Sequence, residues 1–325
     1  MDLTIILCTY NRCDKLAEAL ESLAMQKANP MWQWEVLVVD NNSDDTTVDV
    51  YHKLESAFPV PLRYAFEPSL GLSYARNHGI REAQGRYVAF IEDDEIADEH
   101  WVESILGTFQ DNCCDAVAGT IELSWRASRP LWLTDEILGF LGYLNYGHEQ
   151  ALTEARPPFG GNMAFSKAVF GKIGLFDTAL GRKGRKLTGG DEIDLFKHFL
   201  RAGFVGIYQP KAVTYHIIEK NRLKKFYFRK LHFYEGKLFG QTYNIVTGKK
   251  IVGVPLFVFR QLFRSVLKYA STLFERGLNN SLRDEMVIWY FWGLIVGCFE
   301  QSCVLRRNLR LLYYIAVPVA AVIWI

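Results

Sequence analysis

Four consecutive carboxylates close an apolar run of the sequence. They are Glu92, Asp93, Asp94 and Glu95, directly after residues 87–91. Adjacent carboxylates repel one another, so the cluster requires either a bound cation or exposure to solvent. Oxygen ligands at this density suit Mg²⁺ and Mn²⁺, which keep waters and share their other positions with substrate phosphates. Because side chains alternate along a strand, we expect Glu92 and Asp94 to point the same way and to bind the metal. An acidic first turn for a helix over residues 99–106 is the competing interpretation.

Two further polar clusters also follow apolar runs. One is Thr9, Tyr10, Asn11 and Arg12, and the other begins at Asp40 and continues to residue 45. The first could hold a nucleotide base and a phosphate, although a helix cap would explain it equally well. A carboxylate at the position of Asp40 can accept hydrogen bonds from ribose hydroxyls or from a base N–H.

A fourth cluster supplies candidates for acid–base chemistry. Asp191 and Glu192 follow two glycines and open an amphipathic stretch. One of the pair could be a general base, while the other tunes it or binds an acceptor hydroxyl. Ordinary complementarity to the helix dipole is the alternative for both. His216 ends a strand-like run and could ligate the metal through a neutral ring nitrogen.

The elements that would position these clusters alternate along the first half of the chain. Short β-branched runs predict strands buried on both faces, over residues 3–8, 35–39, 62–66, 87–91 and 116–121. Helical spacing of apolar residues predicts helices over 14–26, 46–57 and 73–83. This alternation predicts an α/β fold with a mostly parallel central sheet flanked by helices. Ligands are expected at the carboxyl ends of its strands, where the polar clusters lie.

The second half is less regular. Residues 125–155 read as an aromatic-rich loop or a small insertion, and order returns near residue 160 with a helix predicted over 192–202 and a strand over 205–208. Composition becomes basic and aromatic after residue 220, so we expect a catalytic domain over 1–220 and a helical region over 221–325. The apolar stretches 286–299 and 311–325 are shorter than a spanning helix needs. We expect them to lie at a membrane surface; a buried hairpin and a short spanning hairpin are the alternatives.

Composition limits the class of protein. Half of the 325 residues are apolar and 22% are charged, which is typical of a globular protein. The net charge is +1, although acidic and basic residues cluster separately, and no nucleic-acid partner is expected. The six cysteines have no paired-ligand spacing, so neither a disulfide framework nor a zinc site is expected. No secretory leader precedes the first strand, and we therefore expect the active site on the cytoplasmic face of the membrane.

Taken in order, the clusters resemble family two of the glycosyltransferases, which share the GT-A fold. The segments that carry the resemblance are residues 5–12, 38–43, 71–80, 90–95 and 159–165, followed by Asp191, Glu192 and His216. The resemblance implies that Arg76 and Asn77 help place a diphosphate and that Gly160, Gly161 and Asn162 line the acceptor side. It matches residues 92–94 to the family's DxD metal motif, with Glu92 where aspartate is usual. Glu92 could therefore contact the ribose and donor sugar instead, together with Asp93.

The resemblance implies an inverting transfer from a nucleoside diphosphate sugar, with UDP-sugars favoured, to an acceptor hydroxyl. The membrane location expected for the basic, aromatic tail suits a lipid-linked or polysaccharide acceptor. Mn²⁺ or Mg²⁺ would be held by Asp94, with Glu92 and His216 as further candidates. The basic residues 182–186 could close over the donor or form a solvated turn. The C-terminal helices could also form an oligomer contact. A sugar-nucleotide nucleotidyltransferase is one alternative, but residues 9–16 contain no glycine for a phosphate loop. A non-catalytic membrane scaffold is the other.

Overall fold

The computed structural model describes residues 1–181, 190–242 and 249–302, which form two compact units. The first unit contains Met1–Ser128 and Leu138–Lys220. The second contains Arg129–Ile137 and the described residues from Asn221 onward. Nothing in the composition predicts that residues 129–137 join the second unit.

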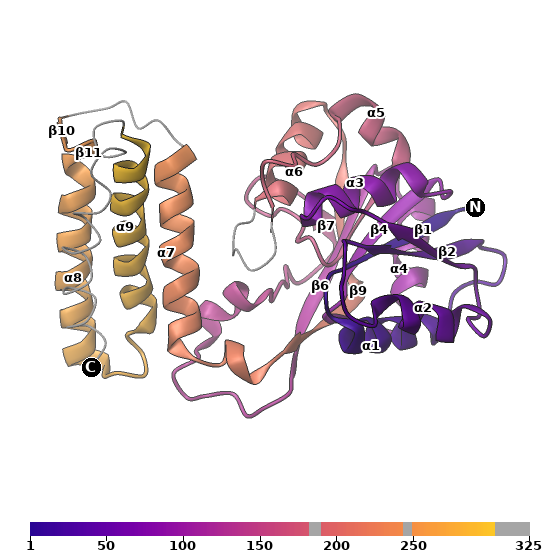
Figure 1. Cartoon of the computed structure of the whole chain (residues 1–325), viewed down its shortest axis with the longest axis horizontal. Coiled ribbons are helices and arrows are strands. Elements are labelled where there is room, and N and C mark those ends of the chain that lie inside the picture. The colour runs from indigo at the N-terminus through magenta and orange to yellow at the C-terminus, as the bar shows by residue number, and fades with distance from the viewer. Residues whose placement is uncertain (182–189, 243–248, 303–325) are drawn as a thin grey trace. The chain divides into compact units, whose positions relative to one another are not determined.

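Among the described residues, nine strands form one sheet in the first unit (Figure 1). They are β1 (Leu3–Thr9), β2 (Trp34–Asp40), β3 (Leu62–Phe66), β4 (Tyr87–Glu92), β5 (Glu95–Ala97), β6 (Ala116–Trp125), β7 (Gln150–Ala151), β8 (Met163–Ser166) and β9 (Gly206–Ile218). The order is β3-β2-β1-β4-β8-β6-β9-β5, with β7 also paired to β9. Strands β3, β2, β1 and β4 are parallel neighbours, as are β6 and β9. The expected mostly parallel α/β sheet is confirmed.

Helices cover both faces of this sheet (Figure 1). They are α1 (Cys13–Ala24), α2 (Thr47–Glu55), α3 (Leu72–Glu82), α4 (Trp101–Asp111), α5 (Phe170–Ile173) and α6 (Asp191–Arg201). The connections also contain short 3₁₀ turns, η1 (Asp135–Leu141), η2 (Lys167–Val169) and η3 (Lys220–Arg222). Helices α1, α2 and α4 bury apolar residues against one face, and α3, α5 and α6 against the other. Strands β1, β2 and β4 are therefore apolar on both faces, which is why their sequences read as continuous β-branched runs.

The carboxyl ends of the central strands lie level with one another. Thr9 at the end of β1 is paired with Asp40 at the end of β2, and Cys8 is paired with Glu92 at the end of β4. The polar clusters that follow these strands therefore meet at one edge of the sheet.

The acidic quartet differs from the expectation in one respect. Strand β4 ends at Glu92, Asp93 and Asp94 form a turn, and β5 begins at Glu95. Strand alternation does not extend through the quartet, so it cannot decide which carboxylates point together. Strand β5 is too short to be read from periodicity.

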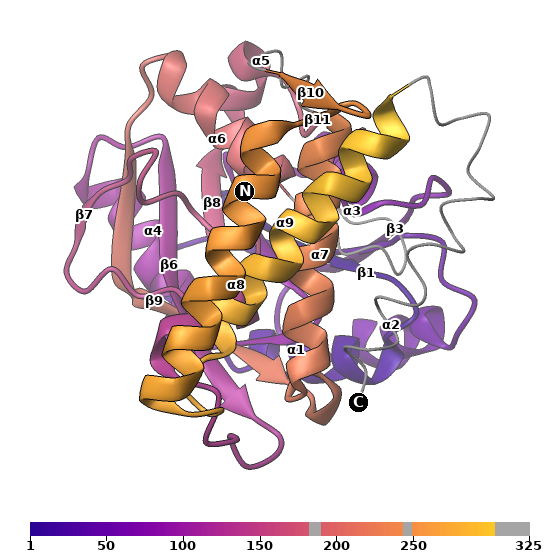
Figure 2. The ribbon, with the colours of Figure 1, turned by 90° about the vertical axis from the view of Figure 1, so that its left-hand side faces the viewer.

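Among its described residues, the second unit contains three long helices. They are α7 (Lys225–Thr242), α8 (Leu256–Arg276) and α9 (Leu282–Gln301), and a small hairpin, β10 (Lys250–Ile251) with β11 (Val254–Pro255), precedes α8. Helix α9 lies between α7 and α8 (Figures 1 and 2). No helix within the described ranges is long and apolar enough to span a bilayer. The apolar stretch 311–325 and the basic residues 182–186 lie outside the described residues.

Glycines bring α7 and α9 into backbone contact. Gly236 and Gly240 on α7 face Gly293 and Gly297 on α9. A Cβ on Gly293 would lie 2.0 Å from the carbonyl oxygen of Phe233, and one on Gly236 would lie 2.0 Å from that of Tyr290. Neither contact involves a flexible side chain, so the crossing requires glycine on both helices.

We predict that Gly293→Ala destabilises the second unit, because the added methyl group must push two helix backbones apart. Overpacking of this kind costs about 1–3 kcal/mol. Urea unfolding followed by circular dichroism measures the loss. Gly171→Ala in α5 is the control, because no atom lies within 4 Å of its Cβ position. Equal stability of the two variants would contradict the glycine packing.

Candidate active site at the carboxyl edge of the sheet

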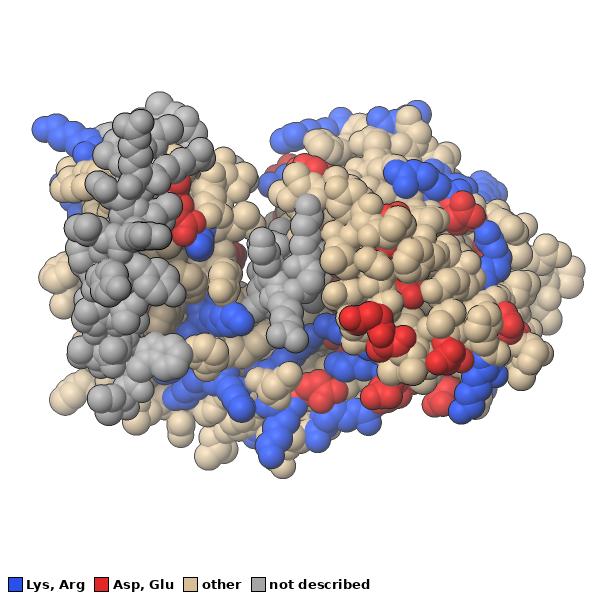
Figure 3. All heavy atoms as spheres, in the orientation of Figure 1, with Lys and Arg blue, Asp and Glu red and all other residues tan. Residues whose placement is uncertain are grey.

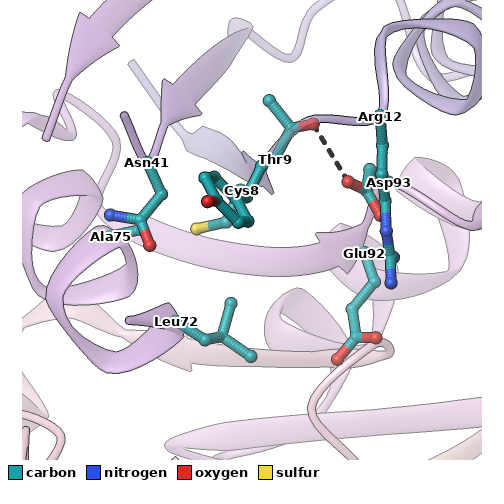
Figure 4. Close-up of a pocket in the computed structure, with 9 residues that line it drawn as sticks. Cys8, Thr9, Arg12, Asn41, Leu72, Ala75, Glu92 and Asp93 are labelled. Carbon is teal, nitrogen blue, oxygen red and sulfur yellow. Dashed lines mark hydrogen bonds and ion pairs between the residues drawn. The ribbon is translucent and has the colours of Figure 1, made fainter. Parts of the chain in front are cut away.

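A pocket of about 110 Å³ opens where β1, β2 and β4 end (Figure 4). Its lining consists of Cys8, Thr9, Tyr10, Arg12, Asn41, Leu72, Ala75, Glu92 and Asp93. These residues come from three polar clusters, from Cys8 in β1 and from the start of α3. The clusters that the sequence separates by tens of residues are thus brought to one cavity.

Arg12 forms ion pairs with both residues of the turn in the acidic quartet. Its Nη1 atom lies 2.8 Å from Asp93 Oδ1 and 3.2 Å from Asp94 Oδ2. Thr9 donates a hydrogen bond of 2.9 Å to Asp93 Oδ2. Burial, opposed by the charge of Arg12, raises the pKa of Asp93 to about 6. One guanidinium therefore serves two buried carboxyl groups and compensates them incompletely.

His216 approaches Asp94 from β9. Its Nε2 atom lies 3.5 Å from Asp94 Oδ2, and its Nδ1 atom lies 2.5 Å from the carbonyl oxygen of Leu141. A carbonyl can only accept, so Nδ1 carries a proton and donates it to Leu141, and Nε2 is the ring nitrogen directed toward Asp94. This is the arrangement by which a backbone carbonyl orients a metal-ligating histidine.

Arg76 joins the pocket to the start of α6. Its side chain is buried, with Nη2 3.4 Å from Glu92 Oε1 and Nη1 2.9 Å from Asp191 Oδ2. Ser73 donates a second hydrogen bond, of 3.1 Å, to Asp191 Oδ2. Glu92 therefore faces Arg76, whereas Asp93 and Asp94 face Arg12.

The two carboxylates at the start of α6 have opposite protonation preferences. Burial would raise the pKa of Asp191, but the charge of Arg76 and hydrogen bonds from Glu192 and Ser73 hold it below its usual range. Burial and the charge of Asp191 raise the pKa of half-buried Glu192 to about 7. Asp191 is therefore a fixed anion, and Glu192 titrates near neutrality.

Glu95 is the most isolated carboxyl group of the quartet. It is buried, its Oε2 atom has no hydrogen-bond partner within the described part of the chain, and burial raises its pKa well above the usual range. It lies against the backbone of Gly161, where a Cβ would fall 2.0 Å from Oε1. Gly160 in the same way lies against Arg76, with its Cβ position 2.2 Å from Nη2. The absence of side chains at Gly160 and Gly161 thus leaves room for the guanidinium group of Arg76 and the carboxyl group of Glu95.

Two other residues expected at the donor hold the loops of this edge. Asp40 is buried, accepting hydrogen bonds from the Ser43 backbone N–H at 2.9 Å and from the Tyr64 hydroxyl at 2.7 Å. Asn11 has a φ of 51° and accepts a hydrogen bond from the backbone N–H of Asp44. Asp40 does not line the pocket, whereas its neighbour Asn41 does.

Asn77 and Asn162 contact the backbone rather than the cavity. Both polar atoms of Asn77 bond to the backbone of Phe176, at 2.8 and 2.9 Å. Asn162 is fully buried and bonds to Trp101 and to the carbonyl oxygens of Thr120 and Ala212. Their observed contacts are those of residues that fix loops behind the site.

Sequence reasoning missed Ser73, Asn41 and the buried state of Glu95. Ser73 lies at the start of α3, three residues before Arg76, so helical spacing places both on one face. Asn41 directly follows the end of β2, but the carboxylate of its neighbour Asp40 is the more obvious ligand for a ribose or a base. The burial of Glu95 depends on β9, whose pairing with β5 has no local signal.

The site contains more carboxyl groups than positively charged side chains. Glu92, Asp93, Asp94, Glu95, Asp191 and Glu192 contribute six carboxyl groups. Within the described residues, the positive charges paired with this set are those of Arg12 and Arg76, and His216 lies 3.5 Å from Asp94. A divalent cation beside Asp94 and His216 would correct this imbalance. No group of three or more His, Cys, Asp or Glu within the described residues is placed to hold a metal. Further ligands would then be phosphates and water, as is usual for Mg²⁺ and Mn²⁺.

Residues 4–174 match the family model of glycosyl transferase family 2. Two relatives represent the similar proteins. The glucosyl-dolichyl phosphate glucuronosyltransferase of Haloferax volcanii is 31% identical over 57% of this chain and 59% of its own length. The succinoglycan biosynthesis protein ExoM of Rhizobium meliloti is 25% identical over 74% and 75%. The chain thus spans less than two thirds of the first relative.

Two solved structures have the same fold. The Pyrobaculum calidifontis mannosyltransferase PcManGT, in complex with GDP-Man and Mn²⁺, has a TM-score of 0.59 and covers 92% of this chain and 88% of its own. S. aureus TarS 1-349, in complex with UDP-GlcNAc, has a TM-score of 0.53 and covers 91% of each chain. Both are 16% identical to this chain, so the likeness establishes the GT-A fold alone.

We predict that Asn77→Ala lowers the free energy of unfolding by about 1–3 kcal/mol, because the backbone N–H and C=O of buried Phe176 lose their partners. Nucleotide affinity should not change, since Asn77 has no surface in the pocket. Unfolding in urea and calorimetric titration with UDP measure the two quantities. A stable variant that binds UDP weakly would instead give Asn77 the diphosphate-placing role.

Proposed function

The chain belongs to glycosyl transferase family 2, and we propose that it is an inverting, metal-dependent glycosyltransferase whose donor is a UDP-sugar. The observation that carries this proposal is the meeting of three sequence clusters at one sheet edge. Arg12 from the first cluster holds Asp93 and Asp94, and Arg76 connects Glu92 to Asp191. We propose that the pocket binds the nucleotide, that a cation binds beside Asp94, and that the base lies at the start of α6.

Glu192 is the proposed general base. A base at neutral pH must be deprotonated often enough to act and basic enough to take a hydroxyl proton, which favours a pKa near 7. Glu192 has that pKa, whereas Asp191 is held ionised by Arg76 and is committed to Ser73. Asp191 then acts through its charge, which keeps Glu192 basic.

The proposed reaction is a single displacement. The acceptor oxygen forms a bond to the anomeric carbon while the bond from that carbon to the diphosphate oxygen breaks. Glu192 takes the hydroxyl proton, and the nucleoside diphosphate leaves with the electron pair. A divalent cation held by Asp94 and His216 would stabilise the charge that develops on this leaving group. Arg12, at the pocket lining, supplies further positive charge for phosphate oxygens.

The names and bound ligands of similar proteins support the proposed classes of donor and acceptor. TarS 1-349 has been solved with UDP-GlcNAc and PcManGT with GDP-Man, so a guanosine donor is the competing outcome. The relatives from Haloferax volcanii and Rhizobium meliloti are named for a dolichyl phosphate substrate and for succinoglycan biosynthesis. We propose a lipid-linked or polysaccharide acceptor hydroxyl and a location at the cytoplasmic face of a membrane.

Donor turnover tests the function. Purified protein should release UDP from one or more UDP-sugars with Mn²⁺ or Mg²⁺, and chelation should abolish release. Asp94→Asn should lower the rate by about 10²- to 10³-fold, the loss typical for one group that stabilises developing charge. Asp111→Asn, at an exposed helix end, is the control and should keep full activity. Metal-independent turnover, or full activity of Asp94→Asn, would refute the proposed mechanism.

The pH profile tests the base. Because Glu192 must be deprotonated to accept a proton, kcat/KM should rise with pH and level off above about 7. Glu192→Gln should lose about 10²- to 10⁴-fold in rate. Asp194→Asn on the same helix should keep both the rate and the profile. If Glu192→Gln retained the acidic limb near pH 7, another group would be the base.

A further inference from the structure

The outer face of α8 is apolar although it is exposed. The helix packs against α9 through Val258, Ser265 and Thr272, which recur every seven residues. On the opposite side Phe263 is 64% exposed, Leu267 55% and Phe274 94%. In Figure 2 this helix lies in front of α9 and faces the viewer. Large apolar side chains aligned along a helix in this way mark an interaction surface.

A row of basic residues runs beside these apolar side chains. Arg260, Arg264 and Lys268 are four residues apart and therefore lie along one side of the helix. Lys268 is paired with Asp284 at 2.7 Å. Within the part of the chain that the structure describes, Arg260 and Arg264 form no ion pair, and both are exposed. Their positive charges remain available to an external partner.

The β10–β11 hairpin adds a second exposed element of the same character. Ile251 and Val252 at its tip are 52% and 51% exposed, and the exposed Lys249 and Lys250 precede them. Val252 has a φ of 48°, which is unfavourable for a β-branched residue. In Figure 3 basic side chains protrude at the corner where Figure 1 labels this hairpin. Both elements thus combine exposed apolar side chains with lysine or arginine.

We infer that the outer face of α8, together with the hairpin tip, docks on a membrane that contains anionic lipids. Apolar side chains would enter the boundary between headgroups and acyl chains, while Arg260 and Arg264 meet lipid phosphates. The core of a protein–protein interface is depleted of charge, whereas here charged residues alternate along the helix with the apolar ones. This charge pattern favours a lipid surface over a second copy of the chain. The inference rests on the proposed membrane location and specifies its contact surface.

Vesicle binding of the full chain tests this surface without any substrate. The probes are vesicles of phosphatidylcholine alone and of phosphatidylcholine with phosphatidylserine. Wild type should prefer the anionic vesicles, and salt should weaken that preference. Phe263→Ser with Phe274→Ser should reduce binding to both vesicle types by about tenfold or more. Arg260→Gln with Arg264→Gln should reduce binding only to anionic vesicles, by about 25-fold at roughly fivefold for each charge.

Matched controls come from exposed residues of the first unit. Met31→Ser with Val48→Ser controls for lost apolar surface, and Lys53→Gln with Arg81→Gln controls for lost charge. Both controls should bind vesicles as wild type does. All variants should keep their melting temperature and their UDP release, so failed docking is distinguishable from failed catalysis.

Three results would overturn the inference. Wild type could bind neither vesicle type, or the α8 variants could bind as wild type does. The α8 apolar variant could also convert an oligomer to a monomer in light scattering and keep full vesicle binding. That last result would make this face a contact between copies of the chain.

Discussion

This site depends on one constraint. Several carboxyl groups are buried at one edge of the sheet with too few positive charges to compensate them. Asp93, Asp94, Glu95 and Asp191 are each at most 4% exposed, and two guanidinium groups contact the set. Burial disfavours the charged form of a carboxyl group unless a cation compensates it. The shortage explains why the pKa of Asp93 rises to about 6 and that of Glu192 to about 7. The edge is thus suited to receive a cation together with a phosphate.

The surrounding fold keeps these groups at close quarters. Gly160 and Gly161 let Arg76 and Glu95 lie against backbone, where any larger residue would collide with them. Asn162 ties β8 to Thr120 and Ala212, and Asn77 ties α3 to Phe176. These links come from segments far apart in the chain. These contacts therefore hold the carboxyl groups together at the edge of the sheet.

Local sequence patterns predict the strands of the central sheet, but they do not predict which groups the polar side chains contact. Strands β1 to β4 and helices α1 to α3 are predictable to within two residues at most boundaries, because apolar runs and helical spacing are local signals. The alternation of side chains along β4 does not predict the directions of Asp93 and Asp94, because the strand ends at Glu92. The backbone contacts of Asn77 and Asn162 depend on distant segments and have no local signal. The four-residue spacing of Gly236–Gly240 and Gly293–Gly297 is a local signal for the close packing of α7 and α9.

The central claim is that a divalent cation binds beside Asp94 and completes this edge together with a diphosphate. Anomalous X-ray scattering from crystals grown with Mn²⁺ and UDP tests it most directly, because the signal identifies manganese without reference to activity. The account predicts one strong peak within bonding distance of an Asp94 oxygen and of a phosphate oxygen, with His216 Nε2 directed toward it. UDP bound in the pocket with no manganese peak beside Asp94 would contradict the account.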